Sequence, residues 1–110
     1  MASTELQAIV RFRFHDGDVE EFKRLSVQCM EIVRTQDTGT LQYDTYFNDD
    51  ETECIVIERF CDSDALIQHG ENLAHLMDAI VAHAIRSEAC APPGSLAFEL
   101  LRQRRETDHA

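Results

Sequence analysis

The sequence predicts an α+β domain with the element order strand, helix, strand, strand, helix, strand. Three segments show the alternation of hydrophobic and polar residues that is typical of β-strands; they are residues 5–15, 40–48 and 52–61. Two segments carry hydrophobic residues at helical spacing; they are residues 18–36 and 62–84. Short polar turns separate these segments, and residues 84–91 predict a fourth strand.

The first strand has one strongly apolar face and one mixed face. Alternate positions on the apolar face carry Leu6, Ala8, Val10, Phe12 and Phe14. In the helix that follows, Asp18 and Glu21 have the spacing of a capping box at the helix start. Gly39 comes just after this helix, and we expect it to take a positive φ there.

The third strand is expected at the centre of the sheet. Both of its faces carry apolar residues, such as Ile55 and Val56, which favours cover on both sides. The acidic turn at 48–51 predicts a hairpin with the preceding strand.

The second helix is expected to start at a cap formed by Asp62-Ser63-Asp64. We expect it to be interrupted at His69-Gly70 and to continue with Asn72 as a second cap. After the fourth strand, residues 95–104 are expected to form a short terminal helix or arm, followed by a frayed tail.

This order of elements is the split βαβ, or ferredoxin-like, arrangement, in which two helices cover one face of a four-stranded antiparallel sheet. The uncovered face still carries apolar residues, which are Ile9, Tyr46 or its neighbours, and either Val56 or Ile57. We therefore expect a second copy of the sheet to cover it, which predicts a homodimer with two sheets face to face.

The length, composition and charge of the chain predict its domain count and limit the classes of partner that it can bind. The 110 residues predict a single domain spanning 1–110, and 44% of them are hydrophobic, as in ordinary globular proteins. A net charge of −11 repels phosphate groups, so nucleic acids and anionic membranes are poor partners. An anionic substrate would need a local basic pocket.

No signal peptide or membrane-spanning segment is recognised, so the expected location is the cytoplasm.

The sequence offers no motif for a cofactor, a metal or a hydrolytic nucleophile. The four cysteines form no C-x-x-C pair, and we expect them to be buried free thiols. No histidine pair has metal-ligand spacing on a helix, so no metal site is predicted. A phosphate-binding glycine loop and the G-x-S-x-G motif are both absent.

The ionisable residues leave two interpretations open. Glu58 lies on an apolar strand face, so it either pairs with a strand arginine or belongs to a site. His69 lies at the expected helix interruption, where it either lines a pocket or caps the helix. His75 is six residues further on and is more easily explained as a surface residue.

Several motifs in order resemble the antibiotic biosynthesis monooxygenase family. Asp16-Gly17 followed by Val-Glu-Glu-Phe is similar to the turn and helix start of that family, and Thr38–Tyr43 to its entry into the second strand. Ile57–Phe60, Asp62–Ala65 and His69 resemble its next signature. The resemblance runs from about residue 5 to residue 101.

The resemblance implies a dimeric α+β barrel that oxidises quinols, anthrones or related polycyclic phenols with O₂ and without metal or flavin. It implies catalytic roles for Tyr43, Glu58 and His69, and substrate binding by Asn72 and His75. A base would take a phenolic proton, and the resulting carbanion would pass an electron to O₂. The chain has no tryptophan, which argues against the haem-degrading branch.

Two alternatives remain on the same fold. One is a small-ligand-binding protein or isomerase without oxygenase activity, in which Arg11 and Arg13 receive an anionic metabolite. The other is an interaction module whose function is dimerisation itself. The sequence thus predicts a small aromatic or anionic ligand without deciding whether the protein is an enzyme.

Overall fold

The computed structural model describes residues 4–91 and confirms the predicted order of elements. The elements are β1 (Leu6–Phe14), α1 (Val19–Gln36), β2 (Thr40–Phe47), β3 (Glu53–Phe60), α2 (Ser63–His83) and β4 (Ala84–Ala91). The terminal helix or arm predicted at 95–104 lies outside the described residues. Neither α1 nor α2 is long and apolar enough to cross a membrane.

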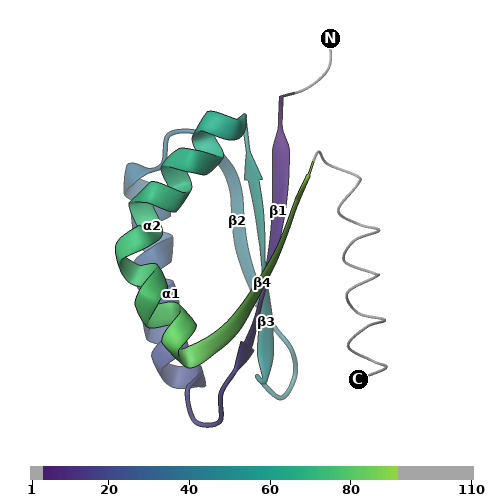
Figure 1. The fold of residues 1–110 in the computed structure, drawn as a ribbon, viewed down its shortest axis with the longest axis vertical. Helices are drawn as coiled ribbons and strands as arrows, with labels where there is room; N and C mark the ends of the chain where they lie inside the picture. The colour runs from purple at the N-terminus through teal and green to yellow at the C-terminus, as the bar shows by residue number, and fades with distance from the viewer. Residues whose placement is uncertain (1–3, 92–110) are drawn as a thin grey trace.

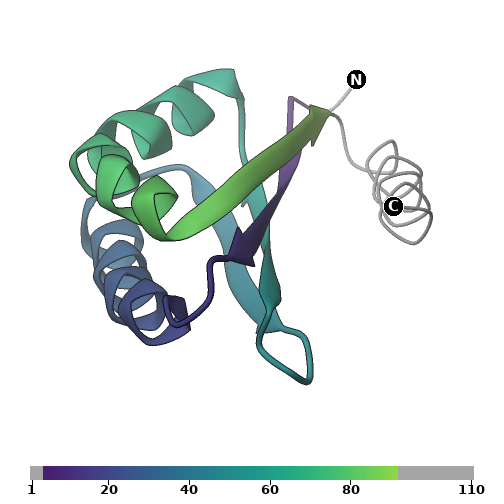
Figure 2. The same cartoon turned by 60° about the horizontal axis from the view of Figure 1, so that its bottom comes forward.

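The four strands form one antiparallel sheet in the order β2-β3-β1-β4. The prediction that β3 is central is confirmed, and the hairpin at 48–51 joins it to β2. Both helices lie against the same face of the sheet (Figures 1 and 2). The predicted ferredoxin-like α+β fold is therefore confirmed.

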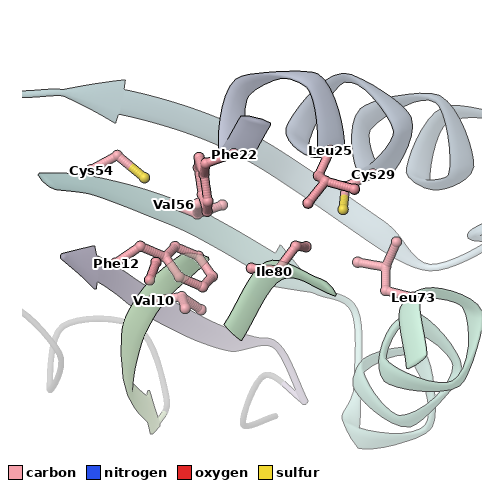
Figure 3. Close-up of a cluster of buried hydrophobic side chains, with 10 residues drawn as sticks. Val10, Phe12, Phe22, Leu25, Cys29, Cys54, Val56, Leu73 and Ile80 are labelled. Atoms are coloured by element: carbon pink, nitrogen blue, oxygen red, sulfur yellow. The ribbon is translucent and has the colours of Figure 1, made fainter. Parts of the chain in front are cut away.

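The main core lies between the helices and the sheet (Figure 3). It is built by the alternate strand residues that face the helices and by one stripe of each helix. Its buried members are Val10, Phe12, Phe22, Leu25, Cys29, Cys54, Val56, Leu73, Ile80 and Ala84. The ring of Phe22 packs on Phe12 and Phe14, with centroids 4.9 Å and 4.6 Å apart, which closes one end of this layer.

The two helix starts differ in a way that the sequence did not show. At α2, Asp62 has extended backbone angles and its carboxylate accepts a bond of 2.8 Å from the amide of Ala65, so the predicted cap is confirmed. At α1 the predicted capping box is wrong. Asp18 has helical angles (φ −99°, ψ −3°) and makes no side-chain cap, while Glu21 pairs with Arg24.

The prediction of positive φ at Gly39 is also wrong, because Asp37 leaves α1 in an extended conformation that needs no left-handed residue. A glycine is needed at position 39 because neighbouring atoms leave no room for a side chain. A Cβ atom there would lie 2.6 Å from the Cβ of Ala65 and 2.8 Å from the Sγ of Cys61. The glycine thus lets the start of β2 approach the start of α2. Positive φ is found at Gly17 instead.

The predicted interruption of the second helix does not occur, and α2 is continuous from Ser63 to His83. Glycine keeps its amide and costs a helix only about 1 kcal/mol relative to alanine. The buried residues Leu73 and Ile80 anchor the helix to the core beyond Gly70. Asn72 therefore has no helix start to cap.

The prediction that all four cysteines are buried holds for two of them. Cys29 and Cys54 belong to the core, and burial raises the pKa of their thiols to about 11 and about 12. Cys61 and Cys90 are exposed. Cys61 follows the last residue of β3, and Cys90 lies on the edge strand β4, so neither has neighbours on all sides.

Candidate active site

An apolar pocket of about 500 Å³ lies between the helices and the sheet. Such a volume is typical of sites for small organic molecules. Most of its wall is hydrophobic: Val10, Phe12, Phe22, Val56, Leu66, Leu73, Ala74, Met77 and Ile80. The polar lining residues are Ser26, Cys29, Tyr43, Glu58, His69, Arg86 and Glu88.

The strands bring Glu58 and Tyr43 to the wall of this pocket. Glu58 is on the helix-facing side of β3, between the buried residues Val56 and Phe60. Tyr43 is its direct neighbour on β2 and faces the same way. Burial raises the pKa of Tyr43 far above its usual value, so its phenol stays protonated and can donate a hydrogen bond.

His69 reaches the same place from α2, four residues before the buried Leu73 and therefore on the same face of the helix. Its Nε2 lies 3.0 Å from Oε1 of Glu58. Its ring packs against Tyr43 and Phe60, with centroids 5.5 Å and 5.0 Å apart. The structure thus brings together the three residues Tyr43, Glu58 and His69.

Asp37 completes this group from the other side, whereas its position in the sequence predicts only the end of a helix. Its side chain is 1% exposed, and Oδ2 lies 2.7 Å from Nδ1 of His69. Asn72 donates to its Oδ1 at 2.8 Å and Thr40 to its Oδ2 at 2.7 Å. One signal was present in the sequence: a carboxylate just after a helix faces the negative end of the helix dipole, which is unfavourable without a partner.

The charges of this group follow from its contacts. Burial by itself lowers the pKa of His69, but the contacts with Glu58 and Asp37 outweigh burial and the pKa is raised. Burial also works against ionisation of Asp37, yet bonds from Asn72, Thr40 and His69 hold its pKa below the usual value. His69 is therefore stabilised as an imidazolium that donates to a carboxylate on each side.

The edge strand β4 contributes a second polar pair at the other end of the pocket. Arg86 and Glu88 lie on its helix-facing side, opposite Phe12 and Val10, and their side chains form a 2.7 Å ion pair. Both side chains are about one-third exposed. The sequence does not reveal this pair, because residues 84–91 show no clear alternation that would indicate which of them face inward.

Three predicted site residues are not brought to the pocket wall. Asn72 contacts Asp37 and so supports His69 from behind. His75 is exposed on α2 and does not line the pocket. Arg11 points to the opposite face of the sheet, where it forms a 2.7 Å ion pair with Glu53. Within residues 4–91, no group of three or more His, Cys, Asp or Glu side chains is arranged to hold a metal ion.

Fold and site together define a ferredoxin-like α+β domain whose apolar pocket meets a buried carboxylate–histidine–carboxylate chain. Residues 6–77 match the model of the family described as antibiotic biosynthesis monooxygenase, and the chain belongs to this family. Among curated protein sequences, no match was found.

Solved structures share the fold at low sequence identity. Rv0793 from Mycobacterium tuberculosis is 18% identical, with 81% of this chain and 94% of that chain covered and a TM-score of 0.74. SnoaB from Streptomyces nogalater, a cofactor-independent oxygenase, is 15% identical, with 84% and 95% covered and a TM-score of 0.74. MupZ from Pseudomonas fluorescens is 20% identical, with 98% and 83% covered and a TM-score of 0.76.

Proposed function

We propose that this protein is a cofactor-independent monooxygenase that oxidises a quinol-like or polycyclic phenolic substrate with O₂. The observation that carries the proposal is the buried chain Glu58–His69–Asp37, which opens onto an apolar pocket of about 500 Å³. Membership of the monooxygenase family supports it, as does the similarity to SnoaB, which is itself a cofactor-independent oxygenase.

The first step is removal of the phenolic proton. Glu58 lines the pocket and accepts this proton, while His69 donates to Glu58 from behind. Because the two groups share one hydrogen bond, they act as one proton-accepting unit. The imidazolium of His69 also offsets the negative charge that develops on the substrate. A positioned acid–base group of this kind contributes about 10²- to 10⁴-fold to a rate.

The second step transfers electrons from the substrate to O₂. The substrate carbanion passes one electron to O₂, and the resulting radical and superoxide combine to form a carbon–oxygen bond. The peroxide takes up the proton held by the Glu58–His69 unit. Loss of the remaining proton from that carbon, with departure of hydroxide that is protonated to water, leaves a carbonyl group. One oxygen atom enters the product and the other leaves as water, so O₂ is the only oxidant needed.

The pocket suits this chemistry because its wall is mainly hydrophobic. A site with little water protects the radical pair from side reactions and strengthens the interactions between charges within it. The phenol of Tyr43, which stays protonated, lies beside Glu58 and can donate to an oxygen atom of the bound substrate.

The proposal is tested by O₂ uptake with 1,8-dihydroxyanthrone, with the quinone product followed by absorbance. We expect turnover by the wild-type protein and a loss of at least about 10²-fold in Glu58→Gln and in His69→Ala. Glu71→Gln is the matched control because Glu71 is an exposed carboxylate on α2 outside the pocket. Equal rates for wild type and both site variants, or no uptake above buffer, contradict the proposal for this substrate class.

We further propose that the protein is a homodimer joined through the sheet face opposite the helices. The support is the apolar character of that face, where Tyr46 is 56% and Ile85 is 59% exposed. Sedimentation equilibrium should give twice the monomer mass. A charge introduced by Ile85→Glu should shift the protein toward monomer, whereas Ile67→Glu, at an exposed position on α2, should not.

A further inference from the structure

Arg86 is a charged lining residue that the proposed chemistry does not use. Of the arginine and lysine side chains within residues 4–91, it is the one that lines the pocket. The chain as a whole has a net charge of −11. A guanidinium group at an apolar pocket is therefore placed against the general field of the protein, and this marks it as a local site for negative charge.

The two polar ends of the pocket are well separated. Glu58 pairs with Ala8 on β1, and Ala8 pairs with Cys90 on β4, so these three residues form one row across the sheet. Arg86 is four residues from Cys90 along β4. Two strand spacings and four residues of rise place the Cα atoms of Glu58 and Arg86 about 16 Å apart. A ligand that meets both groups must be elongated, with a polar group at each end.

Arg86 already pairs with a carboxylate at the pocket wall, that of Glu88. Their 2.7 Å ion pair already places a carboxylate oxygen against the guanidinium at the pocket wall. A guanidinium has five N–H donors in a fork that matches a carboxylate. A ligand carboxylate can therefore join Glu88 at Arg86 or replace it there. Because both side chains are about one-third exposed, they can rearrange at low cost.

We infer that the pocket selects an aromatic substrate that carries a carboxylate at the end opposite the reacting phenol, and that Arg86 binds this carboxylate. The inference rests on the proposed function for the position of the phenol at Glu58. It also moves the anion site expected at Arg11 to β4. Glu88 holds Arg86 at the wall while the pocket is empty and competes with the ligand carboxylate when it is filled.

Binding of two matched probes tests the inference without turnover. The probes are 1,8-dihydroxyanthraquinone-3-carboxylate and its methyl ester, which differ in charge and share the ring system. We expect the wild-type protein to bind the carboxylate about tenfold more tightly, as one charge-assisted pair predicts. Arg86→Met should remove this preference by weakening binding of the carboxylate, and binding of the ester by the variant shows that it is folded. Glu88→Gln should increase the preference.

Arg34→Met is the matched control, since Arg34 is an exposed arginine on α1 outside the pocket, and it should keep the wild-type preference. The inference is overturned if the wild-type protein binds neither probe, if it binds both equally, or if the preference survives in Arg86→Met. Turnover of uncharged 1,8-dihydroxyanthrone together with equal probe binding would remove this inference and keep the proposed function. A carboxylate preference that depends on Arg86, without O₂ uptake, would keep this inference and contradict the proposed function.

Discussion

The Nδ1 atom of His69 lies 2.7 Å from a carboxylate oxygen of Asp37, which is 32 residues earlier in the chain. The contact joins the end of α1 to the middle of α2 and is almost fully shielded from water. Both ring nitrogens of His69 therefore face a carboxylate, because Nδ1 contacts Asp37 while Nε2 faces Glu58. The state of the proposed site thus depends on a residue that does not line the pocket.

Replacing Asp37 by asparagine should lower the pKa of His69 and reduce the unfolding free energy. The variant removes the charge that stabilises the imidazolium while keeping the shape of the side chain. We expect the pKa of His69, measured by NMR of the imidazole, to fall relative to wild type. We also expect the unfolding free energy in urea to drop by about 1.5–3 kcal/mol, as for loss of a buried hydrogen bond to a charged group. Asp78→Asn, at an exposed position on α2, is the control. An unchanged pKa of His69 would show that Asp37 does not set its charge.

The stability of the protein should depend on pH through His69. Its pKa is raised in the folded state, so folding is favoured by its protonation. This contribution is fully present below the unfolded pKa of about 6.5. It is lost as the pH rises through the folded pKa. The difference in unfolding free energy between wild type and His69→Gln should therefore be largest near pH 6 and shrink toward pH 9. A difference that stays constant or grows over this range would contradict the raised pKa.

Two glycines should respond to alanine in opposite ways. Gly39→Ala places a methyl group 2.6 Å from the Cβ of Ala65, so the start of α2 must shift, and we expect a loss of about 1–3 kcal/mol. Gly70→Ala meets no atom within 4 Å and lies inside α2, so we expect a gain of up to about 1 kcal/mol. Urea unfolding of both variants measures these changes. A stable Gly39→Ala protein would argue against the close contact of β2 and α2.

The four thiols should react in two groups. Cys29 and Cys54 are buried, and burial raises the pKa of their thiols, so in the native protein they are protected from a disulfide reagent. Cys61 and Cys90 are exposed and should react. Titration of the native protein with Ellman's reagent should count about two thiols, and titration in denaturant should count four. Rapid reaction of all four in the native state would mean that the core opens readily.

Local sequence patterns were enough to predict most of the fold. Period-two alternation in β1 and β3, helical spacing in α1 and α2, and the polar turn at 48–51 each report a local backbone preference. At the start of α1 the local pair Glu21–Arg24 took the place of the predicted capping box, and in two other places where a prediction was wrong a tertiary contact decided the outcome. The packing of Leu73 and Ile80 against the core keeps α2 continuous past Gly70. The close approach of Ala65 explains why residue 39 is a glycine.

The sequence by itself determined the fold class, the central place of β3 and three residues of the candidate site: Tyr43, Glu58 and His69. Only the tertiary structure placed Asp37 behind His69, brought Arg86 to the pocket and turned Arg11 to the opposite face. The physical reason is that periodicity reports which way a side chain points from its own element. Which charges meet depends on how helices and strands pack across long stretches of chain, and the energy of a buried charge depends on those partners.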